Sequence, residues 1–157
     1  MSAVATTPAT LVARPAHTLA DAEALRIIRN ACARWMTGDN RHIGQADQWA
    51  WWRSEARKRN AIWLFAPEGS LPVEAVGFGL FRMEDGRWWA TLGLLPEWRG
   101  QGHGVGIYRH LIAHCPGDLW IRVLLTNPGS ARAAEKAGFV PVDSNGVYAE
   151  LVARRGV

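Results

Sequence analysis

The chain has 157 residues, a length that suits one domain with a substantial hydrophobic core. Apolar residues make up 48% of it, but no apolar run approaches the ~20 residues that a membrane-spanning helix requires, so contact with a membrane is not expected. The 18 basic residues outnumber the 14 acidic ones and give a net charge of +4, yet they are scattered along the chain, so nucleic acid is not expected as a partner.

Residues 1–9 are mostly small and lack the basic-then-apolar order of a secretory signal. We expect them to form a flexible N-terminus ahead of a single domain over residues 10–157. The two cysteines, Cys32 and Cys115, both lie within helical patterns, and no Cys or His cluster has the spacing of metal ligands. The chain is therefore expected to carry reduced thiols, no disulfide and no metal, and to be cytoplasmic.

The first half of the chain predicts a strand, two helices and then three strands. The first strand covers residues 10–16, and Thr18 and Asp21 resemble a capping box at the start of the first helix. A second helix is predicted over about residues 44–59, with Trp49, Trp52 and Ala56 on one face. A strand over 61–66 follows, and the segments 73–83 and 87–95 form a hairpin around an Asp-Gly turn.

A glycine-rich loop then separates the end of this apolar strand from a third helix. The loop reads Arg99-Gly100-Gln101-Gly102-His103-Gly104, and apolar residues at helical spacing follow from Val105 to Cys115. Such a junction directs backbone N–H groups and the positive end of a helix dipole at one point, which suits a phosphate. A P-loop would need Gly-Lys-Ser/Thr, and the glycine spacing of a dinucleotide fingerprint is also missing.

A second informative segment follows the predicted strand over residues 119–125. Asn127 stands at the N-cap position of a fourth helix, Pro128 is its first residue, and Gly138 ends it in a left-handed conformation. The Asn127 side chain could cap the helix or bind a ligand. A last hairpin turns at the Asn-Gly pair of residues 145–146.

The loop R-x-x-G-x-G and the Asn segment about 25 residues downstream together resemble the GNAT acetyltransferase superfamily. The resemblance covers about residues 10–152 and is most specific from Leu92 to Phe139. It implies an α+β fold: a mixed, mostly antiparallel sheet of about six or seven strands flanked by about four helices. In that fold the fourth strand carries a bulge and splays from the fifth.

The resemblance also implies acetyl-CoA as co-substrate. Backbone groups at Leu94 and Leu95 would hold the pantetheine arm and polarise the acetyl carbonyl, the loop would hold the pyrophosphate, and the Asn127 side chain would contact pantetheine. The full set of expected cofactor-binding residues is Leu94, Leu95, Arg99, Gly100, Gln101, Gly102, His103, Gly104, Val105, Asn127 and Ser130.

The catalytic residues are less well defined, because the tyrosine that serves many relatives as general acid is replaced by Ala134. Tyr148, in the last hairpin, and Thr91, the hydroxyl of the fourth strand, are the candidates that remain in the pattern. Tyr108 fits the apolar face of the third helix and is expected to pack in the core. Water, His103 or no dedicated acid are open alternatives, so positioning would carry much of the catalysis.

The acceptor site is expected between the first two helices, the fourth strand and the last hairpin. Its candidate residues are Arg29, Asn30, Trp35 and Trp51. The leading hypothesis is an N-acetyltransferase that acts on a primary amine of a small molecule, such as an amino sugar or a nucleotide-linked sugar, or on a protein N-terminus. The alternative is a degenerate domain that binds acyl-CoA as a sensor or scaffold. Exposed tryptophans among the nine also leave a homodimer open.

Overall fold

A computed structural model of the chain describes residues 10–37, 40–70 and 74–156. The expected flexible N-terminus over residues 1–9 lies outside the described residues, as does Val73, the predicted first residue of the hairpin. Within the described part, every predicted strand is present, with bounds that differ by a few residues.

Seven strands form one mixed sheet in the order β1-β2-β3-β4-β5-β7-β6. The pair β4–β5 is parallel and all the other neighbours are antiparallel, which confirms the predicted class. The strands are β1 Leu11–Pro15, β2 Asn60–Pro67, β3 Gly77–Glu84, β4 Arg87–Leu94, β5 Leu119–Leu124, β6 Val140–Ser144 and β7 Tyr148–Ala153.

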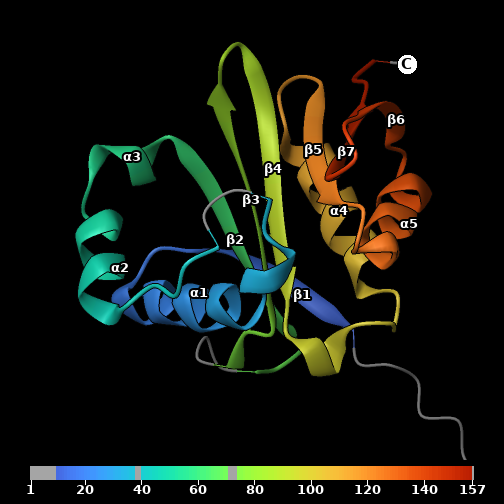
Figure 1. Cartoon of the computed structure of the whole chain (residues 1–157). Helices are drawn as coiled ribbons and strands as arrows, with labels where there is room; N and C mark the ends of the chain where they lie inside the picture. Colours follow the sequence, from blue (N-terminus) through green and yellow to red (C-terminus); the bar gives the residue numbers. More distant parts are fainter. Residues whose placement is uncertain (1–9, 38–39, 71–73, 157) are drawn as a thin grey trace, which may run out of the picture.

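Helices cover both faces of this sheet, with α1, α2 and α3 on one side and α4 and α5 on the other (Figure 1). The α-helices are α1 Leu19–Ala31, α2 Gln45–Trp52, α3 Glu55–Lys58, α4 His103–His114 and α5 Pro128–Ala137, and short 3-10 turns lie at Ala33–Trp35 and Pro96–Trp98. Two apolar cores result. One lies between the sheet and α4–α5, and the other lies between the sheet and α1.

The second predicted helix is wrong in extent, because two short helices, α2 and α3, replace it. The break falls at Ser54, whose hydroxyl donates a 2.6 Å hydrogen bond to the Trp51 carbonyl. Serine side chains compete in this way with the helical backbone. The predicted apolar face is wrong too, since Ala56 is exposed and Gln48 is the buried residue of α2.

The sheet is split between β4 and β5. The two strands pair only at Trp88 with Leu119 and at Trp89 with Trp120, and beyond these pairs they diverge. The expected splay is therefore present. The expected bulge in the fourth strand is not seen, because the register between β3 and β4 runs without a shift from Gly77–Leu94 to Glu84–Arg87. A register shift does occur between β6 and β7, at residues 141–143.

The capping box of α1 also anchors the helix to the sheet. Asp21 is 1% exposed and accepts hydrogen bonds from Arg14 of β1 and from the backbone N–H groups of His17 and Thr18. Burial raises the pKa of this carboxyl, but the hydrogen bonds and the Arg14 charge outweigh it and lower the pKa to about 2. The ionised carboxylate therefore stabilises the folded chain relative to the unfolded one.

We expect Asp21→Asn to lower the free energy of unfolding at pH 7 by about 2 kcal/mol. Because the folded-state pKa lies below the ordinary 3.8, the contribution is complete only above about pH 5 and is lost as the pH falls through the folded-state pKa of about 2. Urea unfolding should therefore separate variant from wild type by the full amount at pH 7 and by roughly a third of it at pH 2.5. Asp118→Asn, at an exposed carboxylate, is the control, and an equal loss there would contradict the prediction.

Candidate functional site

The loop between β4 and α4 presents backbone N–H groups at the open end of the split sheet. Gly100 and Gly102 adopt positive φ values of 76° and 85°, a conformation that favours glycine. Gly102 is the N-cap of α4, and no side chain caps this helix. The first N–H groups of α4 are thus available to an anion, and the helix dipole favours one there.

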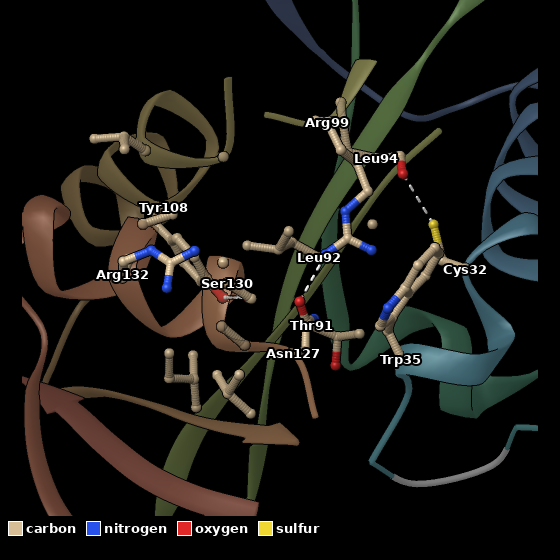
Figure 2. A pocket seen from close by; sticks show the side chains of 18 of the residues that line it. Cys32, Trp35, Thr91, Leu92, Leu94, Arg99, Tyr108, Asn127, Ser130 and Arg132 are labelled. Atoms are coloured by element: carbon tan, nitrogen blue, oxygen red, sulfur yellow. Dashed lines mark hydrogen bonds between the residues drawn. The ribbon is translucent and has the colours of Figure 1, made fainter. Parts of the chain in front are cut away.

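The split itself opens into a cleft of about 380 Å³. Figure 2 shows side chains from both halves of the sheet pointing into it. Its walls are the end of α1 with the turn that follows, the divergent parts of β4 and β5, the glycine loop with the first turns of α4, and the start of α5. A cleft of this size falls in the range of small-molecule sites.

Eight of the eleven expected cofactor-binding residues line this cleft: Leu94, Arg99, Gly100, Gly102, Gly104, Val105, Asn127 and Ser130. The other three lie elsewhere. Leu95 packs against both cores, the Gln101 amide donates to the Glu97 carbonyl, and the His103 ring lies 5.6 Å from that of Trp98. Of the two residues at the end of the strand, Leu94 lines the cleft and Leu95 does not.

The Asn127 side chain makes no capping hydrogen bond, so the capping interpretation is wrong. Its Oδ1 instead accepts a 2.7 Å hydrogen bond from Arg99, which reaches across from the other side of the split. The Arg99 guanidinium also lies 3.9 Å from the centre of the Trp35 ring (Figure 2). Arg99 therefore connects the loop after β4, the loop after β5 and the turn after α1.

Tyr108 of α4 lies at the wall of the cleft, with its hydroxyl 2.8 Å from that of Ser130 on α5. It is 3% exposed, and its ring packs on Phe139, so the expected core packing is present together with a polar contact. Burial raises the pKa of the phenol to about 12, against the lowering effects of Ser130 and Arg99. Ala134 is fully buried beside it and carries no group into the cleft.

The two catalytic candidates lie apart. Thr91 lines the cleft on β4. Tyr148, on β7, pairs in register with Leu124 of β5, and the centre of its ring lies 5.3 Å from the Arg122 guanidinium. Tyr148 is not among the residues that line the cleft. Thr91 is therefore the candidate that the fold brings to the β4–β5 split.

The four acceptor candidates also separate. Trp35 lines the cleft. Asn30 makes two 2.9 Å hydrogen bonds with the backbone of Ile43, and Arg29 donates to the Arg41 carbonyl, so both hold the loop that follows α1. Trp51 packs against the core on the α1 side. The cleft wall thus receives only Trp35 from this set.

Several cleft residues were missed by sequence reasoning: Cys32, Arg122, Arg132 and Lys136. Arg132 and Lys136 are four residues apart, so they share a face of α5, and this spacing could have identified them. Arg122 stands between buried Ile121 and Val123, which places it on the opposite face of β5. The Cys32 thiol donates to the Leu94 carbonyl at 3.2 Å, and burial raises its pKa.

Among the described residues, no group of three or more His, Cys, Asp or Glu side chains is placed to hold a metal ion. None of the described helices is long and apolar enough to span a membrane.

Comparison with known proteins agrees with this architecture. A model of the acetyltransferase (GNAT) family matches residues 23–139. Aminoglycoside acetyltransferase AAC(6')-Ib, solved with coenzyme A and kanamycin, superposes with a TM-score of 0.71 at 18% identity, over 93% of this chain and 95% of that one. No curated protein sequence matches the chain.

Two further structures share the fold. The protein yncA of Salmonella typhimurium, solved with its cofactor acetyl-CoA, gives a TM-score of 0.69 at 17% identity over 90% of each chain. A spermidine N-acetyltransferase chimera from Vibrio cholerae and hSSAT gives 0.70 at 12% identity, over 92% of this chain and 95% of that one. At these identities the likeness establishes the common fold.

Proposed function

Because the chain belongs to the acetyltransferase (GNAT) family, we propose that it transfers an acetyl group from acetyl-CoA to a primary amine of a small molecule. The observation that carries the proposal is the cleft at the β4–β5 split. The uncapped N-terminus of α4 lies in its wall together with the polar side chains of Arg99, Asn127 and Ser130. The cofactor-bound neighbours of the same fold support acetyl-CoA as the donor.

The charge of the cleft supports a phosphate-rich donor. Its charged lining residues are all cationic: Arg99, Arg122, Arg132 and Lys136. Arg132 and Lys136 of α5 line the cleft together with Gly104 of α4. The two helices approach closely there, since a Cβ added to Gly104 would lie 3.5 Å from the Ala133 side chain. The pyrophosphate would lie on the N–H groups of the glycine loop, with these two side chains as counter-charges.

The narrow part of the split suits the pantetheine arm. Asn127 uses only its Oδ1 in a hydrogen bond within the described chain, so its amide nitrogen can donate to a pantetheine carbonyl. Leu94, at the end of β4, has its carbonyl occupied by Cys32. Its position in the wall favours a contact with the acyl end of the donor.

The reaction would be direct attack by a neutral amine on the thioester. A C–N bond forms, the C–S bond breaks, the amine loses one proton to solvent and the sulfur leaves as a thiolate. No tyrosine occupies position 134, and a phenol with a pKa of about 12 is a poor proton donor to a thiolate whose thiol has a pKa of about 8.5. We therefore assign stabilisation of the leaving thiolate to the Arg99 guanidinium, held between Trp35 and Asn127.

The replacement at position 134 favours a second candidate, a domain that binds acyl-CoA without turnover. Release of free thiol from acetyl-CoA, measured with a thiol reagent across a panel of primary amines, separates the two. We expect release that requires both protein and amine. Tight acetyl-CoA binding without release for any amine would favour the sensor, and absence of binding would contradict both functions. A protein N-terminus as acceptor, a homodimer and a cytoplasmic location stay predictions.

A further inference from the structure

A second cavity, of about 330 Å³, adjoins the cleft. Thr37, Ala90, Thr91 and Arg122 line both. Along β4, Trp88, Ala90 and Leu92 pack against the core on the α4 side of the sheet. Trp89 and Thr91 alternate with them and therefore lie on the opposite face, where the second cavity opens. A molecule bound there would reach the cleft at Thr91. We call it the arginine cavity, after Arg82, Arg87 and Arg122 in its wall.

Aromatic rings hold two of these arginines. The Arg122 guanidinium lies 4.3 Å from the Trp89 ring centre and donates through Nε to Glu150 at 2.8 Å. The Arg87 guanidinium lies 3.9 Å from the Trp120 ring centre. Stacking occupies the flat face of a guanidinium and leaves its N–H donors in the plane, pointing sideways, which is the arrangement that recognises a carboxylate or a phosphate.

The ion pairs of the arginine cavity leave one cation without a partner. Arg82 pairs with Glu84 at 3.0 Å and Arg122 with Glu150, whereas Arg87 makes no ion pair within the described residues. Asp85, the other carboxylate in the wall, lies in the exposed hairpin turn. A ligand with several positive charges would find few available carboxylates here, and the adjoining cleft offers it only cations.

We propose that the arginine cavity is the acceptor site and that it selects amines that carry an anionic group, a carboxylate or a phosphate. The amine would lie at Thr91, where the two cavities meet, and the anion at Arg87 and Arg122. Arg87 stands four residues from Thr91 along β4, roughly 13 Å between Cα atoms at the usual rise, so the two ends of the acceptor are separated by several bonds. This inference rests on the proposed function, since it assigns that reaction's second substrate.

Calorimetric titration of the CoA-loaded protein tests the inference. The probes are 6-aminohexanoate against hexylamine, phosphoethanolamine against ethanolamine, and spermidine as a polycation. We expect at least one amine with an anionic group to bind 10- to 100-fold more tightly than its counterpart without that group, the range of one charged hydrogen-bonded contact. The pair of probes that shows this difference identifies the group recognised, a carboxylate for 6-aminohexanoate or a phosphate for phosphoethanolamine.

Arg87→Gln is expected to abolish that preference and to leave CoA affinity unchanged, because Arg87 does not line the cleft. Arg154→Gln is the matched control: Arg154 lies 5.5 Å from the same Trp120 ring but does not line the arginine cavity. Tighter binding of spermidine, an unchanged preference in Arg87→Gln, or no binding of either anionic amine would each overturn the inference. Failure of the proposed function would look different: either CoA itself would not bind, or acetyl-CoA would bind and no amine would cause release of its thiol.

Discussion

Replacing Gly104 with glutamate is expected to weaken acetyl-CoA binding at least about 100-fold. The residue is the second of α4 and lines the cleft, so a carboxylate there would oppose the phosphates at the helix N-terminus at short range. The fold should tolerate the change. A Cβ at this position meets only Ala133 at an ordinary 3.5 Å, and an acidic side chain suits the first turn of a helix. Calorimetric titration with acetyl-CoA measures the loss.

Gly106→Glu is the matched control for this substitution. It adds the same charge to the same helix two residues further on, where a Cβ meets nothing within 4 Å and the residue does not line the cleft. We expect its acetyl-CoA affinity to stay within a few-fold of wild type. Equal losses in both variants would mean that net charge, not the phosphate site, controls binding. No loss in Gly104→Glu would place the pyrophosphate elsewhere.

Replacing Arg99 with glutamine is expected to lower kcat about 30- to 100-fold at saturating acetyl-CoA. The guanidinium lies within the cleft, where a positive charge stabilises a developing anion more strongly than it would in water. Arg99→Lys should recover part of the rate, because it keeps the charge but loses the planar stack on Trp35. Measuring kcat separately from the acetyl-CoA dissociation constant distinguishes this effect from weaker donor binding.

Tyr108→Phe is the comparison that can contradict this assignment. It removes the hydroxyl bonded to Ser130 and keeps the ring that packs on Phe139. Since the phenol pKa of about 12 makes it a poor proton donor, we expect less than about a fivefold change in kcat. A larger loss in Tyr108→Phe than in Arg99→Gln would identify the phenol as the acid that replaces the tyrosine missing at position 134.

The fold was predictable because its signals are local. The capping box at Thr18, the Asp-Gly turn with positive φ at both residues, and Gly138 at φ 117° each follow from short-range stereochemistry and occur as predicted. The interrupted second helix was not predictable, because a single serine hydroxyl at Ser54 competes with the backbone there while the apolar period continues past it.

The site was predictable only where one short segment supplies it. The glycine loop and the helix that it opens are contiguous, so their residues lie together in any fold that forms them, and most of the expected loop residues line the cleft. The proposed acceptor residues come from separate elements. Arg29, Asn30 and Trp51 have suitable chemistry but face a loop or the core, whereas Arg122, in an otherwise apolar strand, reaches both cavities.

The sequence by itself thus determined the class of fold and the family, because the motifs that carry them are short contiguous segments, Arg99–Gly104 and Asn127–Phe139. It also predicts the glycine loop as the phosphate-binding end of the cleft. Only the tertiary structure decided that Asn127 binds Arg99 instead of capping its helix, and that Arg87 stacks on the ring of Trp120. Arg99 and Asn127 are 28 positions apart in the sequence, and Arg87 and Trp120 are 33 positions apart. The pairing of β4 with β5 and the split beyond it bring each pair together, and a local sequence pattern cannot predict contacts over such separations.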